Sequence, residues 1–224
     1  MIYNNIKKGT FISRPNRFIA HVKIDGKEEV CHVKNTGRCK ELLVPGASVL
    51  VEVSDNMQRK TKYDLVSVYK GDRLINMDSQ APNKVFGEWA HRFFKNITFL
   101  KPEAKYKNSR FDFYIEADGR KIFVEVKGVT LEKDNVVLFP DAPTERGVKH
   151  INELCDCVKN GYEAYAFFVV QMTDVKYFTP NKETHKEFAD ALKRAQKKGV
   201  NVLCVDCMVS KNELVINDFI EVIL

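Results

Sequence analysis

The sequence of 224 residues has a globular composition, with 44% hydrophobic residues, 29% charged residues and a formal net charge of +6. This hydrophobic share excludes a disordered chain and is sufficient for the core of one large domain or two small ones. No apolar run approaches the roughly 20 residues that span a membrane, and residues 1–18 lack the apolar core of a signal peptide. We therefore expect a cytoplasmic protein with no membrane partner.

Residues 1–80 are predicted to form a small β-barrel, because short strand-like segments alternate with turn signals such as Asp25-Gly26 and Pro45-Gly46. This half holds 14 Lys and Arg against 9 Asp and Glu, a net of +5, whereas residues 81–224 carry a net of +1. Such a surplus fits an ordinary solvated surface, and it favours nucleic-acid binding only if the second half of the chain carries phosphate chemistry. The basic side chains available in this half are Arg14, Arg17, Lys34, Arg38, Lys40, Lys60 and Lys62.

The boundary to the second predicted domain, residues 81–224, lies within the polar segment 76–83. Apolar residues with helical spacing follow, and Glu88 lies beside that apolar face. The next segment, 110–128, predicts a hairpin, since its two arms are rich in strand formers and meet at Asp118-Gly119, a dipeptide that favours a two-residue type I′ turn.

Two carboxylates face each other in this hairpin. If Ala117 lies opposite Arg120, then Asp112 lies opposite Glu125, and Lys127 shares the face of Glu125, while the reverse face is apolar. Repulsion between two carboxylates about 5 Å apart is roughly 3 kcal/mol at an effective dielectric constant of 20. A divalent cation would offset it, since Mg²⁺ is held by one or two carboxylates with waters and phosphate oxygens. Compensation by Lys127 alone and a solvated Glu-Lys face are the alternatives.

Downstream of the hairpin, residues 135–139 read as a third strand, Thr144 as the N-cap of a helix that ends near Asn160, and residues 164–170 as a buried strand in a parallel pairing. The predicted order is therefore helix, three strands, helix, strand. The polar residues that lie off the apolar stripe of the second helix are Arg146, Lys149, His150 and Glu153.

Six cysteines raise a zinc alternative, because Cys204-x-x-Cys207 has the spacing of a zinc-binding pair. The surrounding segment, however, reads as a buried strand, and Cys155 and Cys157 diverge by about 200° on a helix. Buried, reduced thiols are the simpler interpretation.

The order of elements, with Asp112 on one strand and Glu125-Val126-Lys127 on the next, resembles the PD-(D/E)xK nuclease core. A fuller set of motifs consists of RPNRF at 14–18, KNTGRCKELLVPG at 34–46, SRFDFYI, VEVKGVTL and FPDAPTERGVKHINEL. Together these motifs resemble the sugar fermentation stimulation protein A family over most of the chain. This resemblance implies a mixed α/β fold, in which a DNA-binding OB-like barrel precedes an αβββαβ restriction-endonuclease-like core.

The mechanism that we infer is Mg²⁺-assisted hydrolysis of phosphodiester bonds, with DNA as the expected partner and Mn²⁺ as a substitute ion. Asp112, Glu125 and the carbonyl of Val126 are the expected metal ligands. Lys127 is expected to orient the attacking water and to stabilise charge on the phosphorus. Glu88 is carried over from the helix glutamate of many nucleases of this type. The expected phosphate contacts are Arg14, Arg17, Lys34, Arg38, Arg146, Lys149 and His150.

Asp141 and Thr144 lie in the motif FPDAPTERG, and two roles are open for them: shaping the mouth of the site, or turn and cap chemistry. Three functions are also open. The first is a metal-dependent deoxyribonuclease, which the presence of Lys127 favours. The second is a DNA-binding regulator of sugar (maltose) metabolism genes that uses a nuclease scaffold without turnover. The third is a structural or small-ligand protein. Strand preference, base sequence and oligomeric state are not indicated by the sequence, since phosphate contacts carry no base information.

Overall fold

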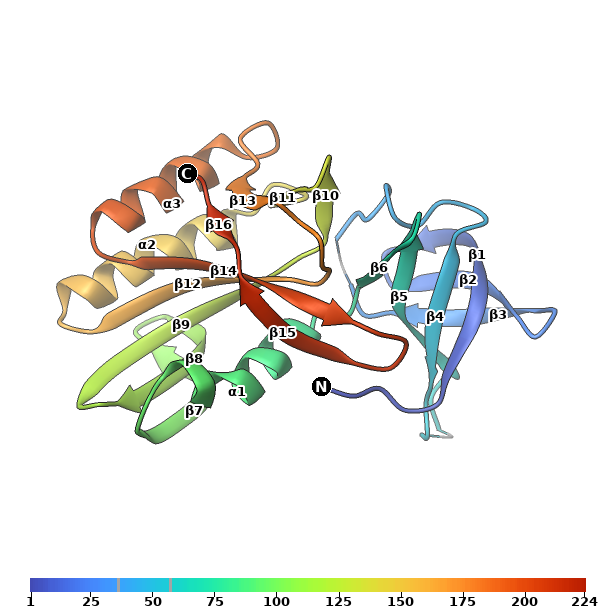
Figure 1. The fold of residues 1–224 in the computed structure, drawn as a ribbon, viewed down its shortest axis with the longest axis horizontal. Coiled ribbons are helices and arrows are strands. Elements are labelled where there is room, and N and C mark those ends of the chain that lie inside the picture. Colours follow the sequence, from blue (N-terminus) through green and yellow to red (C-terminus); the bar gives the residue numbers. More distant parts are fainter. Residues whose placement is uncertain (36, 57) are drawn as a thin grey trace.

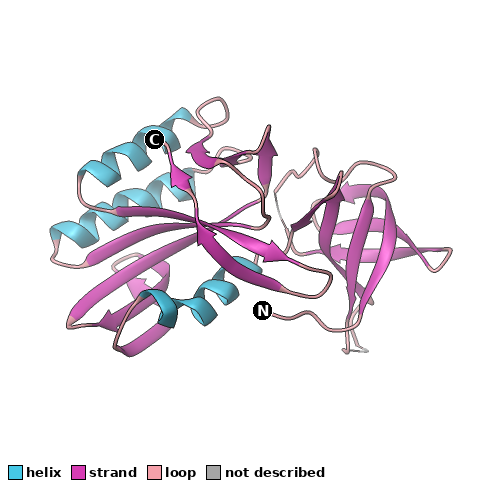
Figure 2. Cartoon of the chain, viewed as in Figure 1, coloured by secondary structure: helices cyan, strands magenta, loops and turns pink. Residues whose placement is uncertain are grey.

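The structure is a computed structural model that describes residues 1–35, 37–56 and 58–224. A β-barrel built from the N-terminal part lies at one end of the molecule, and a larger α/β domain lies at the other (Figure 1). The three helices belong to the larger domain, where they cover both faces of a central sheet (Figure 2). No helix in the described part of the chain is long and apolar enough to cross a membrane.

The N-terminal barrel is closed by a parallel pairing between β3 and β5, which joins the two ends of an otherwise antiparallel sheet. The short strand β6 (Arg73–Asn76) extends the sheet beyond β5. At the predicted turn, Asp25 and Gly26 both adopt positive φ, as a tight hairpin turn requires. The predicted small barrel is confirmed. Its strands are β1 (Ile6–Asn16), β2 (Ile19–Ile24), β3 (Lys27–Val33), β4 (Ser48–Val53) and β5 (Tyr63–Lys70).

The central sheet of the second domain has the strand order β15-β14-β12-β9-β8-β7, and β9, β12 and β14 run parallel at its centre. Helix α1 (Ala81–Phe93) covers one face, whereas α2 (Glu145–Lys159) and α3 (Lys186–Lys197) cover the other (Figure 1). The strands are β7 (Ile97–Tyr106), β8 (Ser109–Ala117), β9 (Arg120–Val129), β12 (Glu163–Val170), β14 (Asn201–Val209) and β15 (Leu214–Phe219).

A separate small sheet contains β10 (Leu131–Lys133), β11 (Val136–Phe139), β13 (Tyr177–Pro180) and β16 (Glu221–Val222). The predicted strand at 135–139 is therefore real, but its expected place in the nuclease core is wrong. The third core strand is β7, which the sequence reading missed because most of its side chains are exposed and it contains Pro102. An edge strand tolerates both features, since one side of its backbone makes no ladder hydrogen bonds. The predicted order of helix, three strands, helix and strand is retained, with β7 as the first of the three strands.

The predicted hairpin forms between β8 and β9. Its register runs from Ala117–Arg120 to Phe113–Val124, as expected from the Asp118-Gly119 turn, whose residues both have positive φ. Beyond Phe113 the ladder ends, and Phe111 joins the hydrophobic cluster on the α2 side instead of the α1 side that holds Phe113. The expectation of one continuous apolar face that includes Phe111 is thus wrong, because β8 separates from β9 at this point.

Direct hydrogen bonds join the barrel to the second domain. Lys70 Nζ donates to Glu132 Oε2 at 2.6 Å, and Arg73 donates to the side chain of Asn135 at 2.7 Å. Gln171, which directly follows β12, donates through Nε2 to Asn76 Oδ1 at 2.7 Å. Residues 1–3 also lie against the second domain, since the amide of Tyr3 donates to the carbonyl of Asn212 at 2.8 Å.

The cysteines of β14 are buried on opposite faces of the central sheet. Cys204 belongs to the cluster beneath α2 and α3, whereas Cys207 belongs to the cluster beneath α1. Their side chains therefore point away from each other, although their spacing resembles a metal-binding pair.

Candidate active site

Glu125 lies on β9, between β8 and β12, and is only 2% exposed. Its Oε1 atom accepts contacts from Lys127 Nζ and His150 Nδ1. Its Oε2 atom is buried and has no hydrogen-bond partner within the described part of the chain. Burial alone would raise the pKa of Glu125, but the contacts with His150 and Lys127 outweigh it and lower the pKa. Glu125 is therefore an ionised carboxylate with one oxygen left for a further ligand.

Asp112 lies where β8 and β9 separate. Its Oδ2 atom accepts a hydrogen bond from the backbone amide of Val126 at 2.8 Å, and its Oδ1 atom accepts one from Asn83 Nδ2 at 2.8 Å. Burial, and next the negative charge of Glu125, raise the pKa of Asp112, although Lys127 and the two hydrogen bonds act in the opposite direction. The two carboxylates are thus close enough that the charge of Glu125 disfavours the ionised form of Asp112, as a like charge in a buried site does.

His150, which was expected to contact phosphate, is instead a buried partner of Glu125 with 4% exposure, and that prediction is corrected. Its Nε2 atom lies 3.4 Å from Arg146 Nε, one turn earlier on α2. Because the arginine nitrogen can only donate, Nε2 is assigned as the acceptor and Nδ1 as the N–H that faces Glu125. Helix α2 therefore delivers to the site a histidine of defined tautomer and, beside it, an exposed arginine.

Asn83 was not predicted as part of the site. It lies in the first turn of α1, and its side chain reaches Asp112 only because the start of this helix packs closely on the end of β9. Gly128 permits that approach, since an added Cβ would lie 2.6 Å from both Pro82 Cγ and Gln171 Oε1. An Asn next to a Pro at a helix start ordinarily indicates a turn or cap, so the sequence carries no signal for this contact.

Glu88 lies elsewhere. Its carboxylate is 2.6 Å from the N-terminal ammonium of Met1, and its side chain is 51% exposed. It follows Asn83 by five residues, which is about 140° around a helix, so the two side chains lie on different faces of α1. We correct the expectation accordingly: the residue that α1 supplies to Asp112 is Asn83, and Glu88 is not part of the site.

Three further predicted residues of the second domain have structural contacts. Thr144 Oγ1 accepts from the amide of Gly147 at 3.0 Å, which confirms it as the N-cap of α2. Lys149 is exposed and lies 3.8 Å from Glu153, a pairing within α2 that does not reach the two carboxylates. Asp141 Oδ2 accepts from the backbone amide of Arg38 at 2.9 Å, so it joins the second domain to a loop of the barrel.

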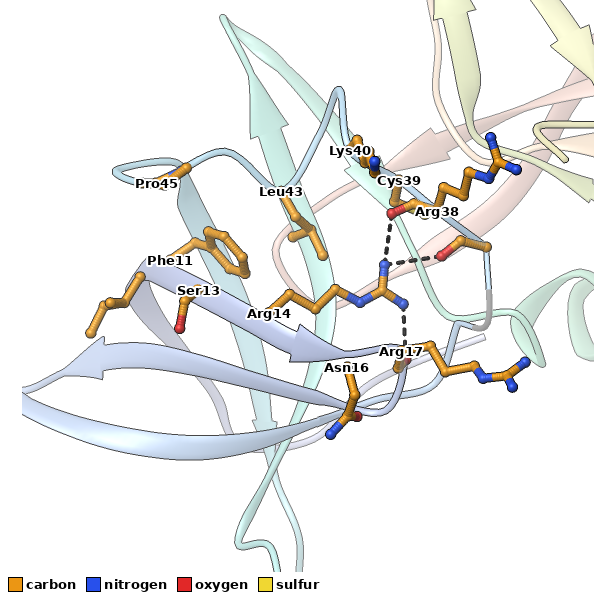
Figure 3. A pocket seen from close by; sticks show the side chains of 12 residues that line it. Phe11, Ser13, Arg14, Asn16, Arg17, Arg38, Cys39, Lys40, Leu43 and Pro45 are labelled. Carbon is orange, nitrogen blue, oxygen red and sulfur yellow. Dashed lines mark hydrogen bonds between the residues drawn. The ribbon is translucent and has the colours of Figure 1, made fainter.

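Arg14 is not available for phosphate binding. Its guanidinium donates to the carbonyls of Arg17, Gly37 and Arg38 at 2.8–3.0 Å (Figure 3). It also donates to the carbonyl of Asn35 at 2.6 Å, and these bonds hold the loop in place. A side chain with this many carbonyl partners is a structural anchor, so its predicted phosphate contact is replaced by a role within the barrel.

Lys34 has a structural role as well. Its Nζ atom lies 3.2 Å from Asp64, 3.7 Å from Asp78 and 3.8 Å from Glu52. Arg59 also pairs with Asp64, and although burial acts the other way, these ion pairs lower the pKa of Asp64 to about 2. With three carboxylates around it, Lys34 is not free to contact an external phosphate, and the prediction is corrected.

Arg17 and Arg38 are the exposed members of the predicted set in the barrel. They border a cavity of about 500 Å³ whose wall also contains Phe11, Lys40 and Pro45. Figure 3 shows both guanidinium groups extending away from this cavity, and Arg38 reaches toward strands of the second domain. Beside them, Phe18 is 48% exposed, and the guanidinium carbon of Arg17 lies 5.4 Å from its ring centre.

A barrel of this topology, followed by an endonuclease-like mixed sheet, places the molecule among two-domain proteins with an OB-like and a restriction-endonuclease-like part. A family model described as "Sugar fermentation stimulation protein RE domain" matches residues 80–213, and one described as "SfsA N-terminal OB domain" matches residues 12–77. The chain belongs to the sugar fermentation stimulation protein family, as its motifs indicated.

Individual relatives match this sequence along its whole length. A sugar fermentation stimulation protein homolog of Clostridium beijerinckii is 63% identical over 226 residues, which cover 100% of both chains. A homolog from Ruminiclostridium cellulolyticum is 62% identical and covers 99% of each chain. The solved structure of SfsA from Pyrococcus furiosus, in complex with Ca²⁺, has 26% sequence identity and a TM-score of 0.90, and the match covers 100% of this chain and 98% of that one.

Proposed function

We propose that this protein is a metal-dependent nuclease that hydrolyses phosphodiester bonds in DNA. The observation that carries the proposal is the buried Oε2 atom of Glu125, which has no hydrogen-bond partner among the described residues, beside Asp112, whose pKa the Glu125 charge helps to raise. A buried acceptor without a partner costs about 1–3 kcal/mol, so a structure that keeps one at a site of like charges is suited to a cationic ligand.

The residues present fit a hard divalent cation. In the described ranges no cluster of three or more His, Cys, Asp or Glu side chains forms a closed metal site. Mg²⁺ does not need one, since one or two carboxylates suffice when waters and phosphate oxygens complete its coordination. The Ca²⁺ complex of the archaeal relative supports the same class of ion. Asp112, Glu125 and the Val126 carbonyl would hold Mg²⁺ or Mn²⁺, which when bound lowers the pKa of a water and polarises a phosphate oxygen.

The other side chains position this pair and bind the substrate. Asn83 and His150 each fix one carboxylate oxygen, which limits the rotation of both ligands. Lys127, held at Glu125, brings a positive charge to the point where charge builds up on phosphorus. Arg146 is exposed, and its Nε atom donates to His150, so within the described part of the chain its terminal nitrogens would be able to bind a phosphate. Arg17 and Arg38 then contact the DNA backbone from the barrel.

The proposal is tested with purified protein, circular and single-stranded DNA, and Mg²⁺ or Mn²⁺. Wild type should cleave, whereas Glu125→Gln should lose at least a hundredfold in rate and keep its DNA affinity. Glu103→Gln is the matched control, because Glu103 is 75% exposed and pairs only with the exposed Arg110 on the outer strands. DNA binding without cleavage under either ion would instead favour a regulator on a nuclease scaffold, and equal cleavage by Glu125→Gln would refute the assigned site.

A further inference from the structure

A second cavity, of about 290 Å³, lies between the barrel and the second domain. It begins at Gly128, the residue after Lys127, and extends to Thr144, the N-cap of the helix that carries His150. Asn35 and Gly37 from the barrel loop form the facing wall. The cavity is therefore lined by both domains, and its lining includes chain neighbours of the proposed cleavage site.

Two polar side chains of its wall, Asn35 and Asp141, are hydrogen-bonded within the protein. Asn35 donates to the carbonyl of Met77 at 2.9 Å and accepts from the amide of Gly37 at 2.7 Å. Asp141 holds the same loop through the amide of Arg38, and an added Cβ at Gly37 would lie 2.6 Å from Asp141 Oδ2. These contacts fix the distance between the walls, so the cavity exists before any ligand arrives.

The apolar part of the wall makes up about half of the cavity surface and consists of aliphatic, proline and phenylalanine residues. A volume near 290 Å³ is at the lower end of the range for small-molecule pockets, which suits one planar ring system and excludes a stacked duplex. Apolar faces bind the π-face of any base and therefore tolerate different sequences. The apolar lining residues are Val129, Leu131, Leu138, Phe139, Pro140 and Pro143.

We propose that this cavity holds one unstacked nucleobase of the substrate strand, next to the phosphate at the cleavage site. The flanking charges agree with this occupant, since Arg38 on the barrel loop and Arg146 on α2 are exposed on the two sides and can contact the phosphates before and after an extruded nucleotide. Extrusion is least costly from a single strand or a distorted duplex. The inference, which rests on the proposed function for its substrate, therefore assigns the protein a preference for unpaired or mismatched DNA.

The test uses a five-nucleotide DNA strand with 2-aminopurine at its centre, flanked by adenines that quench its fluorescence by stacking. Protein is added in Ca²⁺, so the readout is binding alone. We expect the fluorescence to rise severalfold with wild type. Ala142→Trp, which fills the cavity from its wall without removing a hydrogen bond of the described residues, should abolish the rise, while the matched Ala142→Ser should retain it.

A second measurement needs no variant. Replacing the central nucleotide by an abasic one should weaken binding by wild type about tenfold, because the base contacts are lost while the phosphates are kept. No rise in fluorescence, an undiminished rise with a folded Ala142→Trp, or equal affinity for the abasic strand would each overturn the inference. A protein that passes these binding tests and never cleaves with Mg²⁺ or Mn²⁺ would refute the proposed hydrolysis alone.

Discussion

The hydrogen bond between Asn83 and Asp112 gives a quantitative test of the site. Asn83→Ala removes a 2.8 Å donor from a carboxylate that is proposed to bind metal. A hydrogen bond to a charged group contributes about 1.5–3 kcal/mol, which corresponds to roughly a 10- to 100-fold change in an equilibrium constant. The same range is typical when an outer partner of a metal ligand is lost. We therefore expect Mn²⁺ to bind 10- to 100-fold more weakly in calorimetric titrations.

The direction in which Mn²⁺ affinity changes with pH follows from the same hydrogen bond between Asn83 and Asp112. Burial and the Glu125 charge raise the pKa of Asp112, and the Asn83 hydrogen bond opposes that rise. Mn²⁺ must displace any proton from Asp112, so affinity falls as the pH drops through this raised pKa. Removing Asn83 raises the pKa further, so the midpoint of the affinity loss should move to higher pH.

The control for this variant is Asn96→Ala. Asn96 Nδ2 donates to Asp118 Oδ1 at 2.7 Å in the exposed part of the hairpin, which is the same type of bond away from the site. The Asn96→Ala variant should leave Mn²⁺ binding unchanged. Affinity of Asn83→Ala within twofold of wild type, with the same pH midpoint, would refute the assignment of Asp112 as an oriented ligand.

Three further outcomes are expected. Saturation with Mn²⁺ at 100 times its dissociation constant should stabilise the wild type by about 2.7 kcal/mol in urea unfolding, and the double variant Asp112→Asn/Glu125→Gln should show no such gain. Asp64 has a folded-state pKa of about 2 against an ordinary 3.8, so its ion pairs contribute about 2 kcal/mol to the free energy of unfolding. This contribution is complete above roughly pH 5 and is lost as the pH falls toward 2. The unfolding free energy of Asp64→Asn should therefore not show this loss in acid. Arg14→Lys should lower the unfolding free energy by about 2 kcal/mol, because a lysine cannot match its fork of carbonyl contacts, whereas Arg17→Lys should change it by less than about 0.5 kcal/mol.

Local patterns identified the hairpin and the second helix of the core. The Asp118-Gly119 turn fixed which residues of β8 and β9 face each other, because a two-residue loop allows little choice of register. The cap at Thr144 and the apolar run of β12 also depend on neighbours in the sequence, and both were found where predicted. β7 escaped prediction because an exposed edge strand lacks the alternation that marks a half-buried one.

The charged residues of the barrel show the limit of counting charges. Lys34 and Arg14 looked like phosphate ligands in the sequence, yet their partners are three carboxylates and a set of loop carbonyls that come from distant segments. Arg17 and Arg38 were predicted as phosphate contacts from the same basic charge, and in the structure they are exposed. Burial distinguishes the two pairs, and burial is a property of the folded barrel.

The sequence by itself determined the family, the order of domains and the hairpin register from Ala117–Arg120 to Phe113–Val124, since each depends on motifs or on spacing within one hairpin. The expected direct pairing of Asp112 with Glu125 is wrong, because the two strands separate beyond Phe113. Tertiary structure alone decided that Asn83 replaces Glu88 at Asp112, that His150 shares an oxygen of Glu125 with Lys127, and that a cavity forms between the domains. These contacts join segments that are far apart in the chain. Their geometry is set by how helices pack on the sheet and how the barrel docks, which no local pattern of residues encodes.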